Sequence, residues 1–344
     1  MTDSTPLFED LATELLAQVY LHCNSIKDVL SLSSTCQRLR SIYTSGRSLQ
    51  ILARAANVEY GPFEDAIQLV TYNESQPAHL FRDPPLSFPL LKQIVEVGKV
   101  AVRWADDIYP FKKWKDNFED RRLLIHSEKL LLRRALYRLW LYRRAFATST
   151  TLRTIRMSPQ QLARRAALLH NFDNAALAEM ADVQATIRET LASNVCPSNG
   201  AIQRKFRRRF PETNYQLQFN MHLNYPTPTE MALSTQQAQQ YKYYAKYRPT
   251  ATHEPGCEGW GDDISHYYVV EDMLKLDPGQ ILMLKTCAPS KSQVEAYVRG
   301  LGPWFENNGD TFAETLEWVL RQRGVEVAEF NEAVQECEAG VVTL

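Results

Sequence analysis

Residues 11–43 read LATELLAQVYLHCNSIKDVLSLSSTCQRLRSIY, and this stretch decides how the start of the chain folds. Apolar side chains recur along it at the three- and four-residue spacing of one helix face. In the first expected helix these side chains are Leu11, Leu15, Leu16, Val19 and Tyr20. Ser25, followed by Asp28, marks the start of a second helix, which carries Val29, Leu30 and Leu32. Ser34 is expected to cap a third helix, which Gly46 ends.

Three helices within about 35 residues are too few to enclose all of these leucines, because units below about 40 residues usually need outside support. The apolar face that is left over must pack on the rest of the chain or on another protein. The polar positions Glu14 and Asp28 do not follow from hydrophobic periodicity, so they carry separate information.

The order of residues in this stretch resembles an F-box, the adaptor-binding module of ubiquitin-ligase substrate receptors. The family pattern is roughly Leu-Pro-x-Glu-(Leu/Ile)-(Leu/Ile)-x-x-Ile, then Asp-Leu-Leu-x-Leu, then Thr/Val-Cys-(Arg)-x-(Leu/Phe). The matching positions are Leu11, Glu14, Leu15, Leu16 and Val19, then Asp28, Val29, Leu30 and Leu32, then Thr35, Cys36, Leu39 and Arg40. Two positions depart from it: Ala12 replaces the proline, and Gln50-Ile51 lies where many members carry tryptophan. The resemblance covers about the first 50 residues.

The resemblance implies a three-helix unit that binds a Skp-type adaptor, and through it a cullin and its RING subunit. It also implies that the chain performs no chemistry and holds an unidentified protein substrate near the conjugating enzyme. The residues expected to bind the adaptor are Leu11, Ala12, Leu15, Leu16, Val19, Val29, Leu30 and Leu32. Proline at position 12 would preset the start of the helix, so Ala12 is expected to loosen it.

The rest of the chain also reads as helices, so the expected fold class is all-α, with the three-helix F-box unit followed by a larger helical domain. We expect an adaptor-binding domain over 1–55, a connector over 56–89 and a substrate- or partner-binding domain over 90–344. The connector ends in the cluster DPPLSFP at 83–89, where three prolines interrupt any helix.

Helical spacing predicts further helices at 48–56, 90–104, 118–147, 160–170 and 175–192, and near the end of the chain at 264–276 and from 311 to 324. Arginines interleave with the apolar residues of 118–147, which is typical of the solvent-facing side of an amphipathic helix. The polar stretch 196–255, which contains RKFRRRF at 204–210, is expected to be loop-dominated.

The C-terminal region is the expected substrate contact, with Trp260, His266 and Trp304 as candidates. Asp262, Asp263 and His266 could form an acid–base group, but two aspartates at a helix start are more simply explained by the helix dipole. His253 and Cys257 have the spacing of a metal edge without a second pair of ligands. We therefore expect no metal, no cofactor and no catalytic residue.

The charges cancel overall, with 39 Lys and Arg against 40 Asp and Glu, yet they are separated along the chain. Residues 112–165 hold 15 basic and 4 acidic side chains, whereas residues 254–344 hold 17 acidic and 6 basic ones. A nucleic-acid groove is the less favoured reading, because the basic residues alternate with Leu and Trp at helical spacing. No apolar run is long enough to span a bilayer and no secretory signal begins the sequence. The six scattered cysteines are typical of reduced thiols in a cytoplasmic or nuclear protein.

Two alternatives to the ligase function remain open at this point. The chain could bind the adaptor outside a cullin ligase, or its C-terminal half could be an enzyme or a ligand-binding domain. A deep pocket with converging polar groups around Asp262 and His266 would favour the second.

Overall fold

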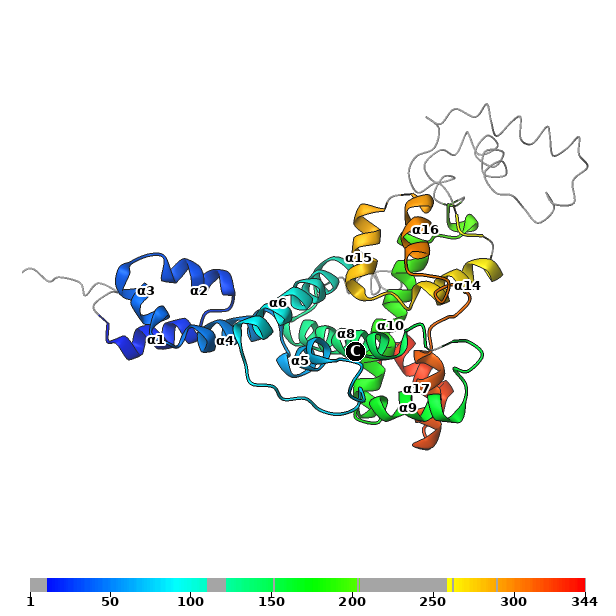
Figure 1. Cartoon of the computed structure of the whole chain (residues 1–344), viewed down its shortest axis with the longest axis horizontal. Helices are drawn as coiled ribbons and strands as arrows, with labels where there is room; N and C mark the ends of the chain where they lie inside the picture. Colours follow the sequence, from blue (N-terminus) through cyan, green and yellow to red (C-terminus); the bar gives the residue numbers. More distant parts are fainter. Residues whose placement is uncertain are drawn as a thin grey trace, which may run out of the picture. The chain divides into compact units, whose positions relative to one another are not determined.

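The computed structural model describes residues 11–109, 122–150, 152–202, 204, 259–261, 263–288 and 290–343. Within these ranges the chain is helical and has no strand, which confirms the all-α class (Figure 1). The chain divides into two compact units. Unit 1 comprises Met1–Phe146, Leu162–Thr186 and Phe312–Leu344, and unit 2 comprises Ala147–Gln161 and Ile187–Thr311. None of the helices in the described ranges is both long and apolar enough to cross a membrane.

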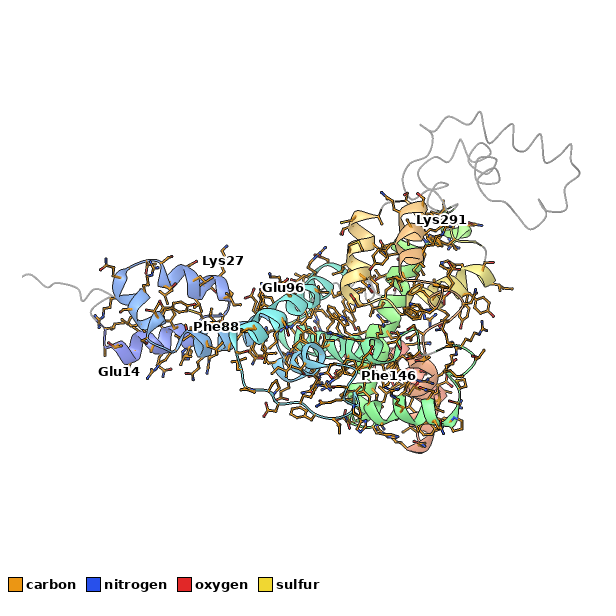
Figure 2. All side chains as sticks on the ribbon, viewed as in Figure 1. Glu14, Lys27, Phe88, Glu96, Phe146 and Lys291 are labelled. Carbon is orange, nitrogen blue, oxygen red and sulfur yellow. The ribbon has the colours of Figure 1, made fainter. Side chains whose placement is uncertain are left out.

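The N-terminal part of unit 1 is a small bundle with its own core. Its helices are α1 (Thr13–Leu21), α2 (Ile26–Ser33), α3 (Gln37–Thr44) and α4 (Ser48–Tyr60). We call residues 13–55 the N-terminal bundle. Its buried residues are Leu16, Ala17, Tyr20, Val29, Leu39, Ile42, Ile51 and Ala55, so α4 supplies part of the cover that the first three helices lack. Glu14 and Lys27 point away from this core (Figure 2).

Local capping explains where α2 and α3 begin. The Ser25 hydroxyl accepts a hydrogen bond from the Asp28 amide at 3.1 Å, as the sequence predicted. The prediction that Ser34 caps α3 is wrong: the cap is Cys36, whose sulfur accepts from the Leu39 amide at 3.5 Å. Ser34 is engaged elsewhere, because its hydroxyl donates to the Ser31 carbonyl at the end of α2.

Helix α4 belongs to two cores at once. Its first half lies in the N-terminal bundle, while Ala56 and Tyr60 pack with Leu91 of α6 (Phe88–Arg103). Gly98 of α6 makes this approach possible, because a Cβ there would lie 2.5 Å from the Tyr60 Cβ. The expected boundary between residues 55 and 56 therefore falls inside a continuous helix, and residues 56–89 lie within unit 1.

The proline cluster before α6 both interrupts and starts helical structure. Residues 83–86 are not helical. The Ser87 hydroxyl then accepts from the Leu90 amide at 3.3 Å, and Pro89 occupies the first turn, where a missing amide hydrogen is harmless. The expected helix 90–104 is observed as α6 with a π-helical turn (Trp104–Ile108) after it.

The remainder of unit 1 is built around a long arginine-rich helix, α8 (His126–Phe146). The others are α5 (Phe63–Thr71), α9 (Pro159–Leu169), α10 (Asn174–Thr190), α17 (Phe312–Gln322) and α18 (Val327–Gln335), of which α9 begins in unit 2 and α10 continues into it. The prediction that the arginines of α8 form a solvent-facing stripe is wrong for two of them. Arg133 and Arg143 are 4% and 2% exposed, because Arg133 donates to the Gly61 carbonyl and Arg143 to the Gln184 side chain.

Unit 2 contains α14 (Asp263–Met273), α15 (Pro278–Cys287) and α16 (Lys291–Gly300), together with the π-helical turn Leu191–Val195. The helix expected at 264–276 is observed as α14 and ends at Met273, and Asp277 caps the start of α15, which the sequence did not predict. Asp277 accepts from the Gln280 amide at 2.8 Å, and the Gln280 side chain accepts from the Asp277 amide at the same distance.

Candidate functional site

The apolar residues expected to bind an adaptor include buried, half-buried and exposed side chains. Leu15 and Leu30 are 54% and 48% exposed, while Leu16 and Val29 are both 0% exposed. The remaining members are Ala12, which is exposed, and Leu11, Val19 and Leu32, which are half-buried. The buried pair holds the N-terminal bundle together, so the surface available to a partner is centred on the exposed members.

The start of α1 is held in a defined conformation despite the alanine at position 12. Ala12 has φ −57° and ψ 146°, and its carbonyl accepts from the Leu15 and Leu16 amides at 3.0 and 3.1 Å. The Arg38 guanidinium donates to the Leu11 carbonyl at 2.7 Å, which ties this turn to α3. Proline requires φ near about −65°, so the backbone at Ala12 already has the shape that proline would impose.

Tyr20 locks α1 to α3 from inside the bundle. Its hydroxyl donates to the Leu39 carbonyl at 3.0 Å, and its side chain is fully buried. Burial raises the pKa of Tyr20 to about 12, with smaller contributions from Cys23, Cys36 and Tyr43. The hydroxyl is therefore neutral at physiological pH and serves as a structural donor.

Among the candidates in unit 2, Trp260 lines a pocket of about 250 Å³. Asp272, Glu295 and Phe305 are among its other lining residues. The Lys291 ammonium lies 5.2 Å from the Trp260 ring centroid, a cation–π arrangement that holds the indole in place. The pocket is small, and most of its charged groups are already bound to neighbours.

His266 and Trp304 do not line this pocket, and the side chain of each is hydrogen-bonded to a backbone carbonyl. The His266 Nε2 donates to the Cys196 carbonyl at 2.7 Å, and the Trp304 indole donates to the Leu301 carbonyl at 2.7 Å. The buried Lys275 ammonium lies 5.4 Å from the Trp304 ring centroid, donates to the Phe305 carbonyl and pairs with Asp272. Burial lowers the pKa of Lys275, and Asp272 opposes that effect.

Several sequence candidates lie outside the described residues: Asp262, the side chain of Asp263, His253, Cys257 and residues 205–210 of the basic run. Over the part of the chain that the structure does describe, no three His, Cys, Asp or Glu side chains are grouped as metal ligands.

A larger pocket, of about 370 Å³, lies in unit 1 and was not predicted. It is formed where residues 78–81 meet α5, α8 and the end of α9. The sequence predicts only a connector over residues 56–89. The apolar pair Leu80-Phe81 in a polar, proline-rich stretch was the signal that could have drawn attention to it.

No protein-family model, curated protein or solved structure matches the chain.

Proposed function

We propose that this chain is the substrate-recognition subunit of a Skp–cullin–F-box ubiquitin ligase, with the N-terminal bundle as its adaptor-binding part. The single observation that carries this function is the exposure of Leu15 and Leu30 on a bundle that has its own buried apolar core. Both leucines also fall on positions of the F-box pattern. A large apolar side chain left in water at such a position is the kind of residue that anchors a protein–protein contact.

The closed core of the bundle supports a preformed binding surface. Tyr20, Leu39 and Ile51 bring three helices together, and Arg38 fixes the turn before α1. A partner that binds such a surface does not have to order it first, which lowers the free-energy cost of association. The exposed Glu14 lies beside Leu15 and would form part of a polar rim.

In this function the chain acts by proximity rather than by chemistry. Binding the adaptor through the N-terminal bundle, and a substrate elsewhere, would convert ubiquitin transfer into an effectively intramolecular reaction. No residue of the chain needs to touch the reacting atoms.

Adaptor binding by the full chain tests this function. Leu15→Asp and Leu30→Asp should each abolish binding of purified Skp-type adaptor in isothermal titration calorimetry, since a buried unpaired carboxylate is strongly unfavourable. Leu123→Asp is the matched control, because Leu123 is 69% exposed and lies outside the N-terminal bundle. Wild-type affinity in both bundle variants would contradict the proposed function.

Co-purification from cells then distinguishes a subunit of a cullin ligase from a protein that binds the adaptor outside a cullin ligase. Recovery of cullin together with the adaptor supports the ligase, and recovery of the adaptor without cullin contradicts it. The Leu15→Asp variant should recover neither protein, which shows that the recovered proteins arrived through the bundle.

A further inference from the structure

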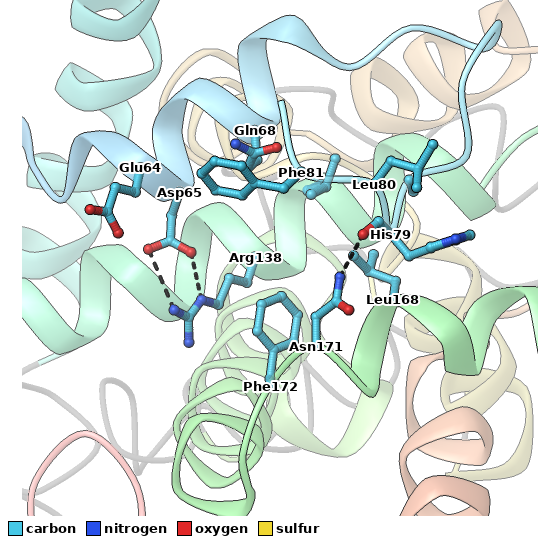
Figure 3. A pocket seen from close by; sticks show the side chains of 12 residues that line it. Glu64, Asp65, Gln68, His79, Leu80, Phe81, Arg138, Leu168, Asn171 and Phe172 are labelled. Carbon is cyan, nitrogen blue, oxygen red and sulfur yellow. Dashed lines mark hydrogen bonds and ion pairs between the residues drawn. The ribbon is translucent and has the colours of Figure 1, made fainter. Parts of the chain in front are cut away.

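We propose that the pocket under residues 78–81 binds a short peptide segment of a partner protein, with a bulky apolar side chain next to a lysine or arginine. The lining residues include Glu64, Asp65 and Gln68 of α5, Arg138 of α8, and Phe81 and Phe172, all seen in Figure 3. If the proposed function holds, the peptide belongs to the substrate, and only that identification rests on the proposed function.

The loop that forms one wall is held in place by polar contacts. Both amide atoms of the Gln68 side chain bond the Arg82 backbone, at 2.6 Å to its carbonyl and 2.9 Å to its amide. The Arg82 guanidinium returns a bond to the Gln68 carbonyl, and Asn171 donates to the His79 carbonyl at 2.7 Å. The loop is therefore an ordered wall.

This clamped loop presents two large apolar side chains to solvent. Phe81 is 72% exposed and Leu80 is 47% exposed, although the backbone on both sides is fixed. An aromatic ring on a fixed backbone has few side-chain torsions left to lose when a partner covers it, which is why such rings serve as contact points. Phe172 adds a second ring to the lining.

The charges of the lining favour a basic group in the occupant. Arg138 is already neutralised, because its Nε donates to Asp65 at 2.6 Å and its guanidinium lies 4.6 Å from the Phe172 ring centroid. Glu64 is exposed and forms no ion pair with another described residue, so it carries the uncompensated charge. His79 points away from Glu64 and contributes its backbone carbonyl to the loop contacts (Figure 3).

The size of the pocket fits one large side chain. Its volume of about 370 Å³ lies at the lower end of the range of about 300–1,000 Å³ typical of ligand sites. A tryptophan or leucine side chain of an extended peptide would fill the space beside Phe81, and the neighbouring lysine or arginine would reach Glu64.

Fluorescence anisotropy on the full chain tests this binding with three labelled peptides that differ only in their two central residues. These are tryptophan–lysine, tryptophan–glutamate and alanine–lysine in the same glycine–serine flanks. The first should bind tightest. Phe81→Ala should weaken it about tenfold, as loss of a central aromatic contact does. Glu64→Gln should weaken it about threefold and abolish the preference for lysine over glutamate, as loss of an exposed ion pair does.

Matched controls separate this pocket from general stickiness and from the N-terminal bundle. Phe88→Ala removes another exposed phenylalanine, and Glu74→Gln removes another exposed carboxylate; neither residue lines the pocket. Both should bind the peptide like the wild type. Leu15→Asp should also keep peptide binding while it loses the adaptor, so the two functions fail independently.

Three results would overturn the peptide site. The first is equal binding, or no binding, of the three peptides. The second is unchanged affinity in Phe81→Ala. The third is a dimer in sedimentation velocity that Phe81→Ala converts to monomer, because the loop would then be an interface between two copies of this chain.

Discussion

Leu15 and Leu16 are neighbours in sequence with opposite predicted roles, and single alanine substitutions should separate folding from adaptor binding. Leu16 is 0% exposed in the N-terminal bundle core, so Leu16→Ala should lower the free energy of unfolding by about 2–5 kcal/mol. Leu15 is 54% exposed, so roughly half of its side chain is covered. Full burial of a leucine contributes about 1.5–3 kcal/mol, so Leu15→Ala should cost only about 1 kcal/mol.

Urea denaturation followed by circular dichroism measures the two free energies, and calorimetry with purified adaptor measures binding. Leu15→Ala should stay folded and lose about tenfold or more in affinity, as expected for a central contact residue. Equal destabilisation by the two substitutions would refute the assignment of Leu15 to the surface. A folded Leu15→Ala chain with wild-type affinity would refute its role as an adaptor contact.

Three further substitutions test local structure. Ala12→Pro should raise the free energy of unfolding by about 0.4–1 kcal/mol in urea titrations, because the backbone already has a suitable φ; a loss of stability would contradict this. Tyr20→Phe should cost about 1 kcal/mol at neutral pH through loss of the bond to the Leu39 carbonyl. Folding raises the pKa of Tyr20 from 10.0 to about 12, so the wild type loses the stabilising contribution of the Tyr20 proton as the pH rises through this interval. The free energy of unfolding of Tyr20→Phe should therefore fall less steeply above pH 10.0 than that of the wild type. Equal pH dependence of the two free energies would contradict the role of the Tyr20 hydroxyl as a buried donor. Gln68→Ala removes the two hydrogen bonds between the Gln68 side chain and the Arg82 backbone, so chymotrypsin should cleave the loop at 78–81 about tenfold faster, as followed by mass spectrometry. An unchanged cleavage rate would mean that Gln68 does not hold the loop in place.

Periodicity predicted the helices whose buried apolar residues lie on one side of the helix, as in α1, α6 and α9. It could not predict the burial of Arg133 and Arg143, because their partners, the Gly61 carbonyl and the Gln184 side chain, are far away in the sequence. The start of α15 at Asp277 was missed for a different reason, since a proline is compatible both with the end of a helix and with the first turn of the next one.

The candidate surfaces were predictable to different degrees. The pattern in residues 11–43 included Leu15 and Leu30, but only the folded bundle shows that these two leucines are exposed while Leu16 is buried. The pocket beside Phe81 could not be predicted, because it needs side chains from three helices and a loop that Gln68 holds in place.

Helix α4 also fixes a distance. Ile51 in one core and Tyr60 in the other lie nine residues apart on this uninterrupted helix, which is a rise of about 14 Å. A protein bound to the N-terminal bundle is thereby kept at a constant distance and orientation relative to α5 and α6. Inserting a full helical turn into α4 would shift the held protein without twisting it, whereas inserting half a turn would rotate it to the opposite side.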